Sequence, residues 1–114
     1  MKRDDCVYLE HILEAMDKID RYIRNLDYSA FASESLIQDG VIRQLEIMGE
    51  ATKNISLQTR DLCPDIPWKD IAGMRDVLIH QYFGVDLHAV WDTAQEDIPP
   101  LKGKIELLIK TLKS

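Results

Sequence analysis

The stretch DCVYLEHILEAMDKIDRYI, residues 5–23, decides the fold class of this chain. Its apolar residues recur at steps of three and four, the spacing that lines one face of an α-helix. Those residues are Leu9, Ile12, Leu13, Met16, Ile19 and Ile23. Asp4 and Asp5 suit the start of such a helix, where the helix dipole favours negative charge. We therefore predict a helix from about residue 4 or 5 to Asn25.

Three further segments repeat this spacing, over residues 33–56, 68–83 and 86–112. Ser33 and Asp86 stand at the start of two of them and suit N-caps, because their side-chain oxygens can accept hydrogen bonds from the free backbone amides of a first turn. Each segment is long enough for a full helix.

The last segment contains Pro99 and Pro100, which predict a kink or a restart near Ile98 because proline cannot donate a backbone hydrogen bond. A short helical insertion is expected around residues 58–65. Four long helices with short connections predict an all-α, antiparallel four-helix bundle, formed as one domain by residues 1–114.

Composition restricts the partners of the chain. The formal net charge is −6, whereas proteins that coat nucleic acid non-specifically are basic. Contact with RNA would therefore need a local site or help from a partner. We find no apolar run that could span a membrane and no signal-peptide pattern, so we expect the cytoplasm. The two cysteines and three histidines form no metal-ligand pattern, so we expect no metal and no cofactor.

The segment RDVLIHQY, residues 75–82, carries the candidate chemistry. Arginine can hold a phosphate bidentately, and histidine can transfer a proton near neutral pH. At about 100° per residue, Asp76 and His80 share one helix face and Arg75 and Tyr82 share another. Asp76 can thus reach the imidazole of His80 and fix its tautomer. The spacing alone also fits an ordinary solvated helix face.

Cleavage of RNA through its own 2′-hydroxyl needs a base, an acid and a cation. One Arg75–His80 pair supplies only one proton-transfer group and one cation. Two copies facing each other across a two-fold axis would supply both proton-transfer roles. The residues therefore make better chemical sense in a homodimer.

The motif and its surroundings resemble the HepT-like HEPN-domain proteins, whose motif is R-x4-H-x-Y. The resemblance runs through nearly the whole chain. Its other matching segments are Met48-Gly49-Glu50-Ala51, Ile66-Pro67-Trp68, Ile71-Ala72-Gly73-Met74-Arg75, Tyr82-Phe83-Gly84-Val85-Asp86 and Val90-Trp91.

This resemblance implies an all-α homodimer whose two motifs meet at a cleft between the subunits. It implies a metal-independent endoribonuclease in which Arg75 and His80 are catalytic and Asp76 supports them. HepT-like proteins are typically toxins of type VII toxin–antitoxin systems. Their antitoxin, a minimal nucleotidyltransferase, adds AMP to the motif tyrosine, here Tyr82, and silences the ribonuclease.

A different reading is a non-catalytic helical subunit that binds a minimal nucleotidyltransferase, which the acidic charge favours. Among the other residues, we expect Trp68 and Trp91 to serve packing and His11 and His88 to lie at the surface. Glu50 could face either the dimer or the cleft, and the sequence does not decide between them.

Overall fold

The computed structural model describes the backbone of residues 2–80 and 86–114 and the side chains of residues 4–74 and 86–114. Within these ranges every regular element is helical, which confirms the all-α class. The elements are α1 (Lys2–Ile23), α2 (Tyr28–Ser33), α3 (Ser35–Lys53), α4 (Leu57–Asp61), α5 (Trp68–His80), α6 (Leu87–Asp92), the π-helical turn η2 (Thr93–Asp97) and α7 (Ile98–Lys113). None of the described helices is long and apolar enough to cross a membrane.

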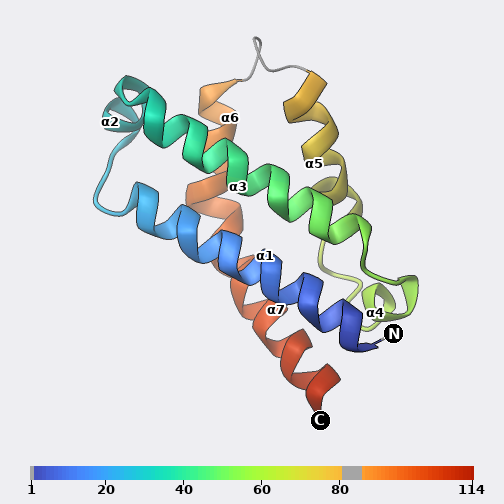
Figure 1. Cartoon of the computed structure of the whole chain (residues 1–114). Coiled ribbons are helices and arrows are strands. Elements are labelled where there is room, and N and C mark those ends of the chain that lie inside the picture. Colours follow the sequence, from blue (N-terminus) through green and yellow to red (C-terminus); the bar gives the residue numbers. More distant parts are fainter. Residues whose placement is uncertain (1, 81–85) are drawn as a thin grey trace.

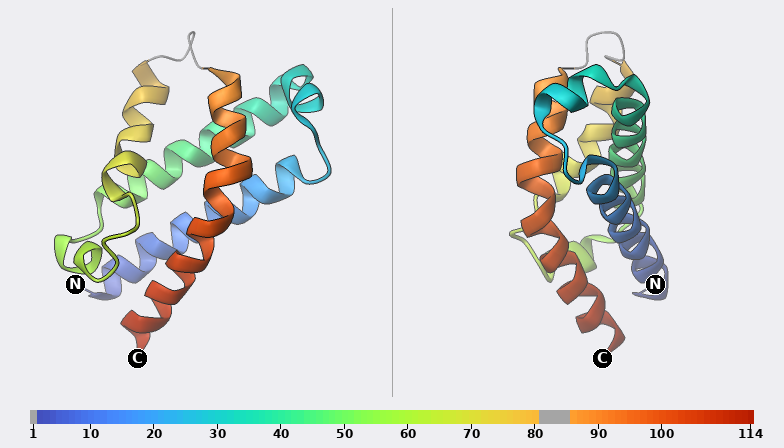
Figure 2. Two further views of the ribbon diagram at one scale, coloured as in Figure 1. Left: turned by 180° about the vertical axis from the view of Figure 1, so that it is seen from behind. Right: turned by 90° about the vertical axis from the view of Figure 1, so that its left-hand side faces the viewer.

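Helix α3 lies at the centre of the arrangement. It runs antiparallel to α1 on one side and packs against α5 on the other, while α6, η2 and α7 form a long rod that crosses behind α1 and α3 (Figures 1 and 2). Three sides of α3 are therefore covered, and its buried residues extend well around the helix. These are Val41, Ile42, Gln44, Leu45, Met48, Gly49, Ala51 and Thr52.

Helix α1 matches its predicted apolar stripe closely. Leu9, Ile12, Met16 and Ile19 are each 0% exposed. The helix ends at Ile23 rather than at Asn25, because Asn25 adopts a φ of 66°, the left-handed conformation that asparagine tolerates better than most residues. The chain then turns back toward α3.

Ser33, which was predicted to cap the second helix, is the last residue of a separate helix. Residues 28–33 form a separate short helix, α2, capped by Asp27, whose carboxylate accepts a hydrogen bond from the Ala30 amide at 2.8 Å. Helix α3 starts only at Ser35 and has no side-chain cap. The formation of α2 as a separate helix has a packing cause, because this helix buries Phe31 completely.

The other two structural expectations hold in part. A short helix does interrupt the chain before Pro67, but α4 covers Leu57–Asp61 rather than residues 58–65. In the last segment the α-helix resumes at Ile98, as predicted. The interruption before it is a π-helical turn, which precedes the prolines. A π turn shifts the hydrogen-bond register before Pro99, which suits residues that cannot donate to the preceding turn.

A buried carboxylate joins the start of α1 to α4. Asp5 is 3% exposed and accepts hydrogen bonds from the Ser56 amide at 3.0 Å, the Ser56 hydroxyl at 2.7 Å and the Thr59 hydroxyl. Burial by itself raises the pKa of Asp5, but the hydrogen bonds from Thr59 and Ser56 outweigh burial, so the pKa lies below its ordinary value. Because Ser56 is also the N-cap of α4, this cluster fixes α4 against α1.

We expect Asp5→Ala to lower the free energy of unfolding at pH 7 by about 2–3 kcal/mol, because it removes a charged acceptor and leaves the buried Thr59 hydroxyl without the carboxylate that accepts its hydrogen bond. The folded-state pKa is depressed, so this stabilisation is complete above the ordinary aspartate pKa of about 4 and is lost as the pH falls through the lowered value. Urea unfolding at pH 7 and pH 2.5 measures both effects. Asp4, the exposed neighbour of Asp5, provides the control. If Asp4→Ala lowered the free energy of unfolding as much as Asp5→Ala, this would contradict the role of the buried cluster.

Candidate functional site

The start of α5 is fixed to the preceding connection by Trp68, the first residue of that helix. Its indole Nε1 donates to the carbonyl oxygens of Arg60 at 3.2 Å and Cys63 at 3.1 Å. The guanidinium of Arg60 in turn donates to the carbonyl oxygen of Thr52 at 2.7 Å, at the end of α3. Trp68 is 7% exposed, so the prediction that it serves packing is confirmed. The helix that carries the motif is therefore anchored at its first residue.

The backbone of α5 continues as helix to His80, so it carries Arg75, Asp76 and His80 on one element. The side chains of these three residues lie outside the described part of the chain, and Tyr82 lies outside it altogether. Four residues before Arg75, Ile71 is buried at 3% exposure. The helical spacing assumed from the sequence thus holds for the backbone, while the side-chain geometry of the motif stays a prediction.

A groove runs between α5 and the crossing rod. It contains two hollows of about 440 and 410 Å³, with Leu45 and Met48 of α3 contributing to their lining. Met74 and Asp70 of α5 and Thr93 of η2 line both hollows. The walls are mainly apolar, and Met74 is only half-buried because it borders this groove. Helix α5 therefore has one covered side, against α3, and one partly open apolar side.

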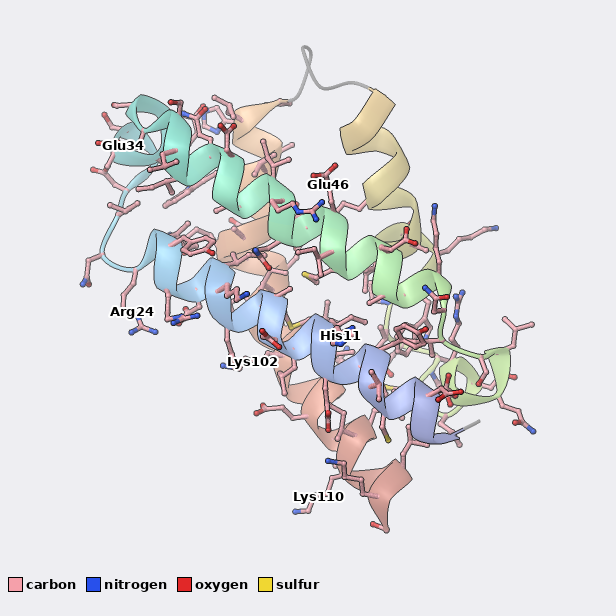
Figure 3. The ribbon with its side chains drawn as sticks, in the orientation of Figure 1. His11, Arg24, Glu34, Glu46, Lys102 and Lys110 are labelled. Carbon is pink, nitrogen blue, oxygen red and sulfur yellow. The ribbon has the colours of Figure 1, made fainter. Side chains whose placement is uncertain are left out.

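A third, more polar hollow of about 410 Å³ lies between α1 and α3. Its lining includes Tyr8, His11, Arg43, Glu46 and Glu50. Figure 3 labels His11 on α1 and Glu46 on α3. His11 is exposed, as predicted, and Glu50 is exposed as well. Glu50 therefore lies at the surface of the single chain. This position does not decide whether it faces the dimer or the cleft.

An aromatic cluster joins α2 to α6. The rings of Tyr28 and His88 stack face to face, with centroids 3.8 Å apart and planes inclined by 15°. Tyr28 also contacts Phe31 and Trp91, at centroid distances of 6.4 and 6.3 Å. Trp91 is 9% exposed and serves packing as predicted, and His88 is exposed as predicted. The stack itself was not predicted, because no local pattern links two residues sixty positions apart.

Cys63 does not have the surroundings of a nucleophile. Cys6 and Cys63 are half-buried free thiols. Burial, followed by a hydrogen bond to Asp65, raises the pKa of Cys63 and keeps its thiol protonated. Asp65 also pairs with Lys104 of α7 at 2.9 Å, and its hydrogen bond with Lys104 lowers the pKa of Asp65. Within residues 4–74 and 86–114, no group of three or more potential ligands is placed to hold a metal ion.

Comparison with known proteins gives consistent matches over nearly the whole chain. A family model described as ribonuclease HepT-like matches residues 12–108. A Thermococcus cleftensis protein named as a probable ribonuclease HepT is 50% identical over 96% of this chain and 100% of its own length. Two Methanocaldococcus jannaschii proteins named as candidate RNases are 46% and 47% identical, over 98% of this chain and 93% and 97% of their lengths. No solved structure matches.

Proposed function

The chain belongs to the HepT-like family of ribonucleases, and from this premise we propose that it is the toxin of a toxin–antitoxin system that cleaves RNA without a metal ion. One observation carries the proposal. Arg75, Asp76 and His80 lie on α5, an unbroken helix anchored by Trp68, inside the range that matches the family.

The proposed reaction begins with the 2′-hydroxyl of the RNA. Its oxygen attacks the adjacent phosphorus while the bond from phosphorus to the 5′-oxygen of the next nucleotide breaks. One His80 takes the 2′ proton, and a second protonates the departing 5′-oxygen. Arg75 binds the phosphate oxygens and stabilises the charge that develops on them. Asp76, one helical turn before His80, orients the imidazole.

The need for two histidines makes the proposed unit a homodimer. The partly open side of α5 supports this assembly, because Met74 and the groove beside it present apolar surface on the helix that carries the motif. Burial of such surface drives most protein–protein association. A second copy covering this side would bring two copies of α5 together.

The proposed regulator is a minimal nucleotidyltransferase that transfers AMP to Tyr82. In that transfer the phenol oxygen of Tyr82 attacks the α-phosphorus of ATP, and pyrophosphate leaves. Tyr82 is two residues beyond His80, and on a continued helix it would share the Arg75 face. AMP attached there would place a bulky negative group beside the phosphate-binding arginine, where it would obstruct RNA.

We expect His80→Ala and Arg75→Ala each to slow cleavage of a labelled RNA at least about 100-fold in the presence of EDTA, since each removes a proton-transfer group or a charge clamp. Gel analysis of the cleavage products measures the rates. His11→Ala, an exposed histidine on α1, is the control and should cleave like the wild type. Equal rates in all four proteins, or loss of wild-type activity with EDTA, would contradict the catalytic assignment.

We expect Met74→Glu to convert the dimer to a monomer and to abolish cleavage, because it introduces a charge into the apolar side of α5. Light scattering after size-exclusion chromatography gives the mass, and circular dichroism checks the fold. Leu36→Glu is the matched control, because Leu36 is 81% exposed and does not line the groove. A folded Met74→Glu protein that remains dimeric would refute this interface.

Co-expression with a minimal nucleotidyltransferase from the same genome should add one adenylyl group to Tyr82 and abolish RNA cleavage. Peptide mass spectrometry locates the group, and Tyr82→Phe should remain unmodified and active. Modification at another residue would contradict the switch.

The non-catalytic alternative predicts that expression of the chain alone leaves growth unaffected, whereas a toxin arrests growth.

A further inference from the structure

The Tyr28–His88 stack has an exposed end. Phe31 is 0% exposed and Trp91 is 9% exposed, whereas Tyr28 is half-buried and His88 is exposed. The rings therefore lead from the core to the surface, and the outermost one is an imidazole resting by one face on a phenol. Tyr28 is the only ring that contacts His88 among the described residues.

Both rings are held by capped backbone. Tyr28 is the first residue of α2, which Asp27 caps through the Ala30 amide at 2.8 Å. His88 is in the first turn of α6, which Asp86 caps through the His88 amide at 3.0 Å. Two short helices thus present a flat aromatic surface that is already ordered before any ligand binds, which lowers the entropy lost on binding.

The stack lies at the end of the molecule where the motif helix ends. Helix α6 begins at Leu87, and Figure 1 shows its first turn and the last turn of α5 at the same end of the molecule. A single RNA strand that reaches the end of α5 could therefore extend to the stack. The caps Asp27 and Asp86 make the surroundings acidic, so this surface suits the uncharged face of a base and not a phosphate.

We propose that the exposed face of His88 stacks against one unpaired nucleobase of the RNA substrate, extending the Tyr28–His88 pair by one ring. This inference rests on the proposed ribonuclease function and adds a substrate-binding residue to it. Stacking on an aromatic side chain tolerates any base, because every base has a π-face. It also requires no positive charge, which fits RNA recognition by a chain with a net charge of −6.

The test measures binding of a short single-stranded RNA that carries 2-aminopurine, in a His80→Ala background so that the RNA is not consumed. Stacking should quench the 2-aminopurine fluorescence. His88→Ala should weaken binding at least about fivefold and reduce the quenching, whereas His88→Phe, which retains a flat ring, should restore both. A merely structural role would lower the melting temperature of His88→Ala without changing the quenching.

His11→Ala is the matched control, because His11 is also exposed but meets Tyr8 edge-on, at 6.0 Å and 86°, and forms no stack. The same RNA annealed into a duplex should show no dependence on His88, since its bases are already stacked. Unchanged binding in His88→Ala, no rescue by His88→Phe, or no RNA binding at all would overturn the inference. RNA cleavage by the chain with His80 intact is measured separately. A failure of the ribonuclease proposal can therefore be distinguished from a failure of the stacking proposal.

Discussion

Helix α3 is buried on three sides, and its packing positions both α1 and α5. Met48 is 0% exposed and Leu45 is 2% exposed, and both also contribute to the groove beside α5. Truncation of such a side chain typically costs about 2–5 kcal/mol, so the placement of α5 on α3 is strongly determined. The close fit extends to α1, because a Cβ on Gly40 would come within 3.2 Å of the Tyr22 ring. The orientation of the motif helix is therefore a consequence of core packing.

The elements that were predictable from the sequence are those whose apolar spacing runs over several turns. The stripe of α1 and the segments that form α3 and α5 belong to this class, because the apolar residues that become buried recur at helical spacing within each segment. Helix α2 was missed because its burial depends on one residue, Phe31, which gives no periodicity. The π turn at Thr93–Asp97 was missed because prolines predict an interruption but not its hydrogen-bond register.

The candidate site divides in the same way. Arg75, Asp76, His80 and Tyr82 are predicted from the order of residues alone, since the motif is contiguous in sequence. The Asp5–Ser56 cluster and the Tyr28–His88 stack each join residues about fifty or sixty positions apart, and only the tertiary fold brings them together. Both depend on short helices whose caps, Ser56, Asp27 and Asp86, are recognisable in sequence but whose partners are not. An acidic chain that acts on RNA needs such local features, because it has no general attraction for phosphate.

Mixed dimers test whether two copies of α5 complete one ribonuclease site. Wild-type chain is mixed with the Arg75→Ala/His80→Ala double variant in known ratios, subunits are exchanged, and RNA cleavage is measured at constant total protein. If both copies are needed, mixed dimers are inactive, and activity follows the square of the wild-type fraction. Activity that falls in direct proportion to the wild-type fraction would show that each chain holds a complete site and would contradict the shared one.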